Sequence, residues 1–260
     1  MNEKEIRREL RRVRNREIEL LLKYKYGKRI NLEGLLNKYL PESLEETLDG
    51  AFREAFKMVF DKGTAIIGKT FNEKKLRESK GTEAEARILW AKDMLITGVE
   101  GTGLGLAGVG LPDIPMFTAM ILRTIYQTAL SYQFDYNTKT EQVFILRLIE
   151  ASLARGTKAE DLSNGLDEYM RRVDKEGYEY YGSINDYVYK TSKAMSDEML
   201  YLKFLQTIPV VGVAGGLSNP IYLNRIKSYA DVKYKKRRLM IRLREAKKER
   251  EERTQISVYE

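Results

Sequence analysis

The sequence contains neither histidine nor cysteine in its 260 residues. Their absence excludes Ser-His-Asp and Cys-His nucleophile systems, zinc sites built on these side chains, disulfides, histidine-bound haem and thiol redox chemistry. We therefore expect no metal site and no cofactor, so any catalysis has to use Asp, Glu, Lys, Tyr, Ser or Thr. The lack of cysteine favours the cytoplasm, and the polar start MNEKEIRRELRR predicts no signal peptide.

Long apolar runs are also scarce. The longest uncharged stretch, residues 204–224, is nominally long enough to cross a bilayer. It contains Pro209, Pro220 and several polar side chains, which are costly at membrane depth. We expect a buried or interfacial segment there. Two glycine patterns, at 63–70 and 103–108, match nucleotide-binding motifs but are not preceded by a strand pattern, so we expect no nucleotide cofactor.

Helical signals dominate the rest of the chain. Apolar residues recur at three- and four-residue steps, Thr138 and Glu141 form a capping-box pattern, and no stretch alternates cleanly between apolar and polar residues. With 43% hydrophobic and 32% charged residues, we expect one all-α domain over 1–260, a helical bundle of about eight or nine helices. The expected helices are 2–26, 43–61, 64–79, 83–97, 114–134, 139–155, 158–176, 184–206 and 221–253.

The net charge of +8 is concentrated at the two ends. Residues 1–30 carry a surplus of six positive charges and residues 225–253 a surplus of eight, so the body at 31–224 is acidic. Basic helices at 1–30 and 221–253 suit phosphates, either of lipid head groups or of nucleic acid. The alternative is that each charged run is a solvated helix face.

Two apolar, glycine-rich segments, 97–113 and 208–220, interrupt the helical pattern, and we expect them to form hairpins. Glycine weakens a helix by about 1 kcal/mol per position, so its density here needs a reason. Close backbone packing, a sharp hairpin and a membrane-facing loop are the three alternatives. For the last, the candidate membrane contacts are Leu104, Leu106, Val109, Leu111, Val211 and Val213.

Two charged residues near the helix at 114–134 are weak catalytic candidates. Asp113 precedes an apolar helix, where an N-cap is the alternative role. Arg123 lies inside that helix among apolar neighbours, so its guanidinium needs a carboxylate or a bound anion. The six tyrosines between 169 and 189 are expected to pack a rim, with a lipid interface or base stacking as alternatives.

The stretch 103–135 closely resembles the signature of the EcsC family, in which a glycine-rich stretch is followed by Asp-[Ile/Leu]-Pro, Leu-Arg-x-Ile and Tyr-Gly-[Tyr/Phe]-Asp. Residues 208–216, Asn219 and 230–234 are similar to the end of the family pattern. Gln133 stands where the family usually has glycine. The matching positions are Asp113, Pro115, Leu122, Arg123, Ile125, Tyr132, Asp135 and Asn219.

This resemblance implies a cytoplasmic bacterial protein from a family named for an operon that also encodes an ABC-type transporter. We take Arg123, Tyr126, Asp135 and Asn219 as the candidate ligand-binding residues.

Three hypotheses follow. The first is a peripheral membrane-associated or lipid-handling accessory protein at the inner face of the cell membrane, with anionic lipid and an ABC-type transporter as partners. The second is a small hydrolase using Asp113 and another carboxylate. The third, nucleic-acid binding through the basic termini, is disfavoured because acidic residues interrupt both runs. Homo-oligomerisation stays open.

Overall fold

The computed structural model of the chain describes residues 2–26, 42–62, 114–207 and 218–259, and these ranges contain only helices and short connections. The result confirms the all-α prediction, with seven helices in the described residues. The helices expected at 64–79 and 83–97 lie outside these ranges. The seven are α1 (Glu3–Tyr26), α3 (Glu42–Lys62), α6 (Ile114–Ser131), α7 (Lys139–Leu153), α8 (Gly156–Glu176), α9 (Asn185–Thr207) and α10 (Ser218–Tyr259).

Local chemistry explains several helix ends. Thr138 is the N-cap of α7, where its hydroxyl accepts a hydrogen bond from the Glu141 backbone N–H, as the capping-box pattern predicts. The α8 helix ends at Gly177, which adopts the left-handed conformation favoured by glycine. The α6 helix ends at Ser131, earlier than predicted, because the chain turns at Gln133 with a φ of +67°.

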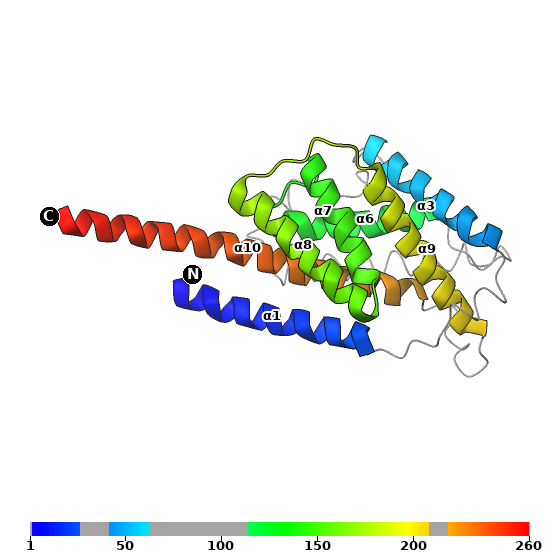
Figure 1. Cartoon of the computed structure of the whole chain (residues 1–260), viewed down its shortest axis with the longest axis horizontal. Coiled ribbons are helices and arrows are strands. Elements are labelled where there is room, and N and C mark those ends of the chain that lie inside the picture. Colours follow the sequence, from blue (N-terminus) through cyan, green and yellow to red (C-terminus); the bar gives the residue numbers. More distant parts are fainter. Residues whose placement is uncertain (1, 27–41, 63–113, 208–217, 260) are drawn as a thin grey trace.

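Helices α6, α7 and α8 pack directly on the first half of α10, and α3 and α9 join the same large hydrophobic core through α6 and α7 (Figure 1). Tyr229 and Tyr234 of α10 are completely buried, and Tyr234 packs edge-on against Phe144 of α7. Buried aromatic groups of this size contribute strongly to core stability. The first half of α10 is therefore a core element on which α6, α7 and α8 pack.

The second half of α10 extends beyond this core and packs beside α1. The two helices run antiparallel, and both chain ends lie at the same end of the molecule (Figure 1). A separate, smaller apolar cluster joins them, in which Ile6, Leu10 and Val13 of α1 are buried with Leu239 of α10. Among the other described helices, α1 packs to any extent only on α8, so it lies at the edge of the described bundle.

Two further expectations concern the surface. Within the described ranges, no helix combines the length and the apolar character that a bilayer crossing requires. Four of the six tyrosines between 169 and 189 pack edge-to-face in pairs, Tyr169 with Tyr178 and Tyr180 with Tyr187, whereas Tyr181 and Tyr189 are exposed.

Candidate functional site

The basic residues in the first part of α10, at 225–244, are turned toward the body of the protein. Residues 225–244 hold nine of its cations, and none of the nine is exposed. Five of them are buried: Arg225, Lys227, Lys233, Lys236 and Arg237. This corrects the expectation that the C-terminal basic helix presents its charge to phosphates. Buried cations require acidic partners, and the acidic body supplies them.

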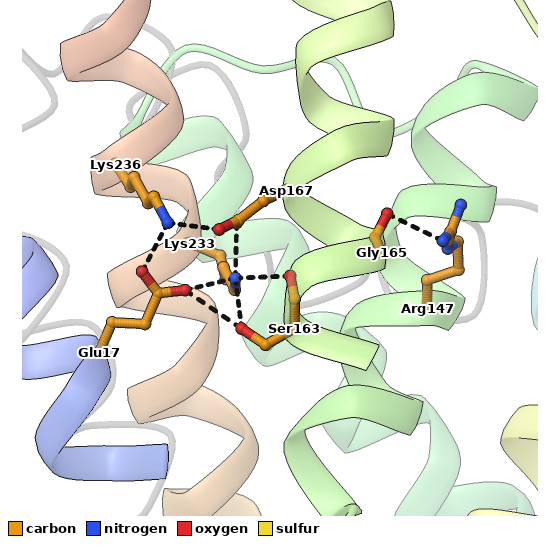
Figure 2. A network of polar contacts seen from close by, with 7 residues as sticks. All are labelled: Glu17, Arg147, Ser163, Gly165, Asp167, Lys233 and Lys236. Atoms are coloured by element: carbon orange, nitrogen blue, oxygen red, sulfur yellow. Dashed lines mark hydrogen bonds and ion pairs between the residues drawn. The ribbon is translucent and has the colours of Figure 1, made fainter. Parts of the chain in front are cut away.

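A network of four charged side chains joins α1, α8 and α10 (Figure 2). Lys233, which is 0% exposed, donates to Asp167 Oδ1 at 2.6 Å and to Ser163 Oγ at 2.8 Å, and forms an ion pair with Glu17. Lys236 donates to the second oxygens of the same carboxylates, at 2.6 Å to Glu17 and 2.5 Å to Asp167. Each lysine thus bridges both acids.

The network is electrically balanced, with two carboxylates and two ammonium groups. Burial alone would raise the pKa of Glu17, but the charges of Lys233 and Lys236 together outweigh burial and lower that pKa. The ionised form of Glu17 is therefore the one that the fold stabilises.

The Ser163–Lys233 contact resembles the serine–lysine pair of some hydrolases, but its surroundings do not suit catalysis. Lys233 Nζ is surrounded by acceptors, two carboxylates and the Ser163 carbonyl and hydroxyl oxygens, so it acts as a donor and not as a proton acceptor. Ser163 itself is 1% exposed. We conclude that this pair holds helices together.

Two more ion-pair clusters attach α10 to the body. Arg237 makes two-pronged contacts with Glu141 and Asp174, each with a closest distance of 2.7 Å, and Tyr234 donates to Glu141 at 2.8 Å. Nearer the start of α10, Arg225 binds Glu198 of α9 at 2.8 Å, and Arg155 binds the same carboxylate. Charge-assisted, bidentate contacts of this kind fix orientation as well as distance.

A groove of about 680 Å³ opens over the central network between α1, α8 and α10. Lys236, Glu17, Asp167 and Ser163 form its polar floor. Its apolar lining is contributed by all three helices: Ile18, Leu21, Leu22, Met170 and Met240. The volume lies within the range of roughly 300–1,000 Å³ typical of small-molecule sites.

The outer face of α1 is the strongly basic surface of the described chain. All eight basic residues from Lys4 to Lys23 are exposed, whereas Glu5 and Glu19 are the only exposed acids among the four in that range. By contrast, the exposed part of α10 at 245–254 carries four basic and four acidic residues and is neutral. Positive potential is therefore concentrated on α1.

The predicted ligand-binding residues do not assemble into this groove. Tyr126 is buried in α6 and stacks on Tyr136, with ring centroids 4.1 Å apart. Asp135 is exposed in the following turn, where it accepts hydrogen bonds from the backbone and side chain of Asn137. Arg123 is half-buried on α6, and Asn219 lies in the first turn of α10.

Several predicted residues lie outside the described ranges: Asp113, Leu104, Leu106, Val109, Leu111, Val211 and Val213. The hydrolase hypothesis based on Asp113 therefore gains no support. Among the described residues, no group of three or more acidic side chains is arranged to hold a metal ion. Of the family-pattern residues, Leu122, Ile125 and Tyr132 are buried core residues.

The sequence analysis missed Glu17, Ser163, Asp167, Lys233 and Lys236. A usable signal was present, because Glu17 occupies an otherwise apolar position on the inner face of α1. A charged residue at such a position needs a buried partner of opposite sign, and the surplus of lysine in α10 offers one.

Comparison with known proteins gives one family and one relative. A model described as the EcsC protein family matches residues 4–239. The uncharacterized protein YdbA of Bacillus subtilis (strain 168) is 29% identical over 156 residues, which cover 59% of this chain and 56% of YdbA. The aligned part thus spans little more than half of that relative. No solved structure matches the chain.

Proposed function

The chain belongs to the EcsC family, and from this premise we propose that it is a peripheral lipid-binding protein that docks on an anionic membrane surface through the outer face of α1. The observation that carries the proposal is the one-sided charge of this helix. The eight cations from Lys4 to Lys23 are exposed, while Glu17 is buried and Glu3 and Glu9 are partly buried.

The spacing of the exposed residues also suits a flat surface. Lys4, Arg8, Arg11, Ile18 and Leu22 follow one another at intervals of three, four or seven residues, which puts them on one stripe of the helix. Basic residues near an anionic membrane contribute about 1 kcal/mol each, and neighbouring apolar side chains can enter the head-group region. The stripe combines both features.

We further propose that docking takes place at the inner face of the cell membrane, because its cytoplasmic leaflet attracts basic segments. An ABC-type transporter, the partner implied by the family resemblance, would lie in the same membrane. The glycine-rich segment 97–113 and residues 208–217 of the second one are outside the described residues and stay candidates for additional membrane contact; residues 218–220 begin α10.

Flotation with vesicles tests the proposal. The protein should float with anionic vesicles, not with neutral ones, and high salt should release it. In the variant Arg8→Gln/Arg11→Gln, the loss of two surface cations should weaken binding by about 2 kcal/mol, or about 30-fold. Both positions are exposed, and glutamine is a good helix former, so the fold should be retained.

The matched control is Lys57→Gln/Lys190→Gln, which removes the same charge from exposed positions on α3 and α9. We expect binding close to that of the unchanged protein. Equal losses in both double variants would mean that net charge, and not the α1 face, drives binding. Equal flotation with neutral vesicles, or none with either kind, would refute the proposal.

A further inference from the structure

The groove between α1, α8 and α10 gathers apolar surface that the fold leaves uncovered. Five large hydrophobic side chains are exposed in the described part of the chain. Two of them, Ile18 at 53% and Leu22 at 47%, are one turn apart on α1 and line this groove. A contiguous apolar lining across three helices is characteristic of a ligand site and not of scattered surface residues.

The charged groups on the floor of the groove are already paired with one another within the protein. Glu17 and Asp167 are each bound by both Lys233 and Lys236, so every charge has its partner and the four charges cancel. A neutral floor with satisfied hydrogen bonds does not attract an ion into the groove. It is compatible with an uncharged, apolar group lying between the side walls.

The rim is charged, and its two sides differ. On the α1 side the rim residue is Arg14, which is exposed and pairs with no acidic residue in the described ranges. It continues the basic face formed by Arg7, Arg8 and Arg11. On the α8 side, the groove is lined by Glu160, Glu168 and Arg171, of which Glu168 and Arg171 form an ion pair. The cation that could attract an anionic head group is therefore on the α1 side, whereas the cation on the α8 side is already bound to a carboxylate.

From these features we infer that the groove binds the apolar chain of an anionic amphiphile, with its carboxylate or phosphate head at Arg14. This inference deepens the proposed function and rests on it, since the same face of α1 would meet the membrane from which such a molecule is taken. The walls contribute through burial of apolar surface, and the head group contributes through charge.

The test is a calorimetric titration in vesicle-free buffer with sodium dodecanoate below its micelle concentration. We expect saturable binding. Butanoate should not bind measurably because it buries little apolar surface, and dodecyltrimethylammonium should bind more weakly because its charge is reversed. Ile18→Glu/Leu22→Glu should weaken dodecanoate binding at least about tenfold, and Arg14→Gln about threefold to fivefold.

Met58→Glu is the matched control, because Met58 is 38% exposed on α3, outside the groove. It should leave dodecanoate affinity unchanged. The inference fails if dodecanoate does not bind, or if Ile18→Glu/Leu22→Glu binds it as well as the unchanged protein does. It also fails if that variant dissociates a dimer while dodecanoate has no effect, since the groove would then be covered by a second copy.

The two proposals can fail separately. Arg8→Gln/Arg11→Gln should reduce flotation but leave the dodecanoate titration unchanged, because neither arginine lines the groove. Loss of flotation with an intact titration would refute membrane docking alone. Normal flotation without dodecanoate binding would refute the groove inference alone.

Discussion

The charge balance of the central network can be tested with a double-mutant cycle of Glu17→Gln and Lys233→Met. Both replacements are close in shape to the original side chains, so packing changes little. The first leaves two lysines with one carboxylate, a buried surplus of one positive charge. The second leaves two carboxylates with Lys236 alone, a surplus of one negative charge.

The magnitude follows from burial. Glu17 is 5% exposed and Lys233 is completely buried, so the remaining uncompensated charge has little access to water. Breaking a buried pair from one side costs about 3 kcal/mol or more. In the double variant only Asp167 and Lys236 remain, and the charges balance again. We expect the free energy of unfolding to fall by about 3 kcal/mol in each single variant. In the double variant it should fall by about 4 kcal/mol, instead of the about 6 kcal/mol that two independent losses would give.

Urea unfolding followed by far-UV circular dichroism gives the free energy of unfolding of all four proteins. The comparison requires that the slope of this free energy against urea concentration is the same for each protein. The informative quantity is the coupling energy of about 2 kcal/mol between the two substitutions. If the two losses simply add to within about 0.5 kcal/mol, Glu17 and Lys233 do not compensate each other and the account of the network is wrong.

Three further predictions concern single positions. The folded pKa of Glu17 lies below its ordinary value of 4.5, so its ionised form stabilises the fold above that pH. This contribution is lost as the pH falls through the folded pKa. In urea unfolding measured at a series of acidic pH values, the free energy of unfolding should therefore fall less steeply for Glu17→Gln than for the unchanged protein. In urea unfolding, Gln133→Gly should be more stable than Gln133→Ala by about 1 kcal/mol. Both variants lose the side-chain contact with Arg238, but only glycine adopts the left-handed backbone conformation of this position without steric strain. Equal stabilities would contradict this. Thr138→Ala should lower the thermal midpoint and reduce the free energy of unfolding by about 1 kcal/mol, because it removes the N-cap hydrogen bond of α7. Thr138→Asp should keep both values, since aspartate is also a good N-cap. If the two variants have the same thermal midpoint, the cap of α7 is unimportant.

Local sequence signals predicted the helices well. Each described helix begins and ends within a few residues of its expected range, apart from the last turns of α10, which continue to Tyr259. These helices could be predicted because the spacing of apolar residues and the capping residues are local properties of the sequence. The early end of α6 was signalled only by the family resemblance, through glycine at the position of Gln133, and that turn has a positive φ.

The candidate site was harder to predict from the sequence, because it depends on contacts between distant parts of the chain. Glu17 and Lys236 are 219 positions apart, and the capping residue Glu141 meets Arg237 from another helix. The sequence contains the signs of these charges but not their pairing. An amphipathic pattern with a basic surplus is compatible with cations facing solvent, lipid or a buried carboxylate, and only the packing of the helices decides among them.

This distinction changes what the positive net charge can do. The cations of α10 at 225–244 are at most partly exposed, and the buried ones among them are held by acids of the body, of α1 or of α10 itself, so they contribute cohesion between helices. The neutral stretch at 245–254 contributes little net potential. The cations of α1 from Lys4 to Lys23 are all exposed. Among the described residues at the two chain ends, attraction to phosphate or carboxylate groups is therefore expected from α1. Its dependence on salt should reflect the eight exposed charges there and not the larger surplus of the C-terminal helix.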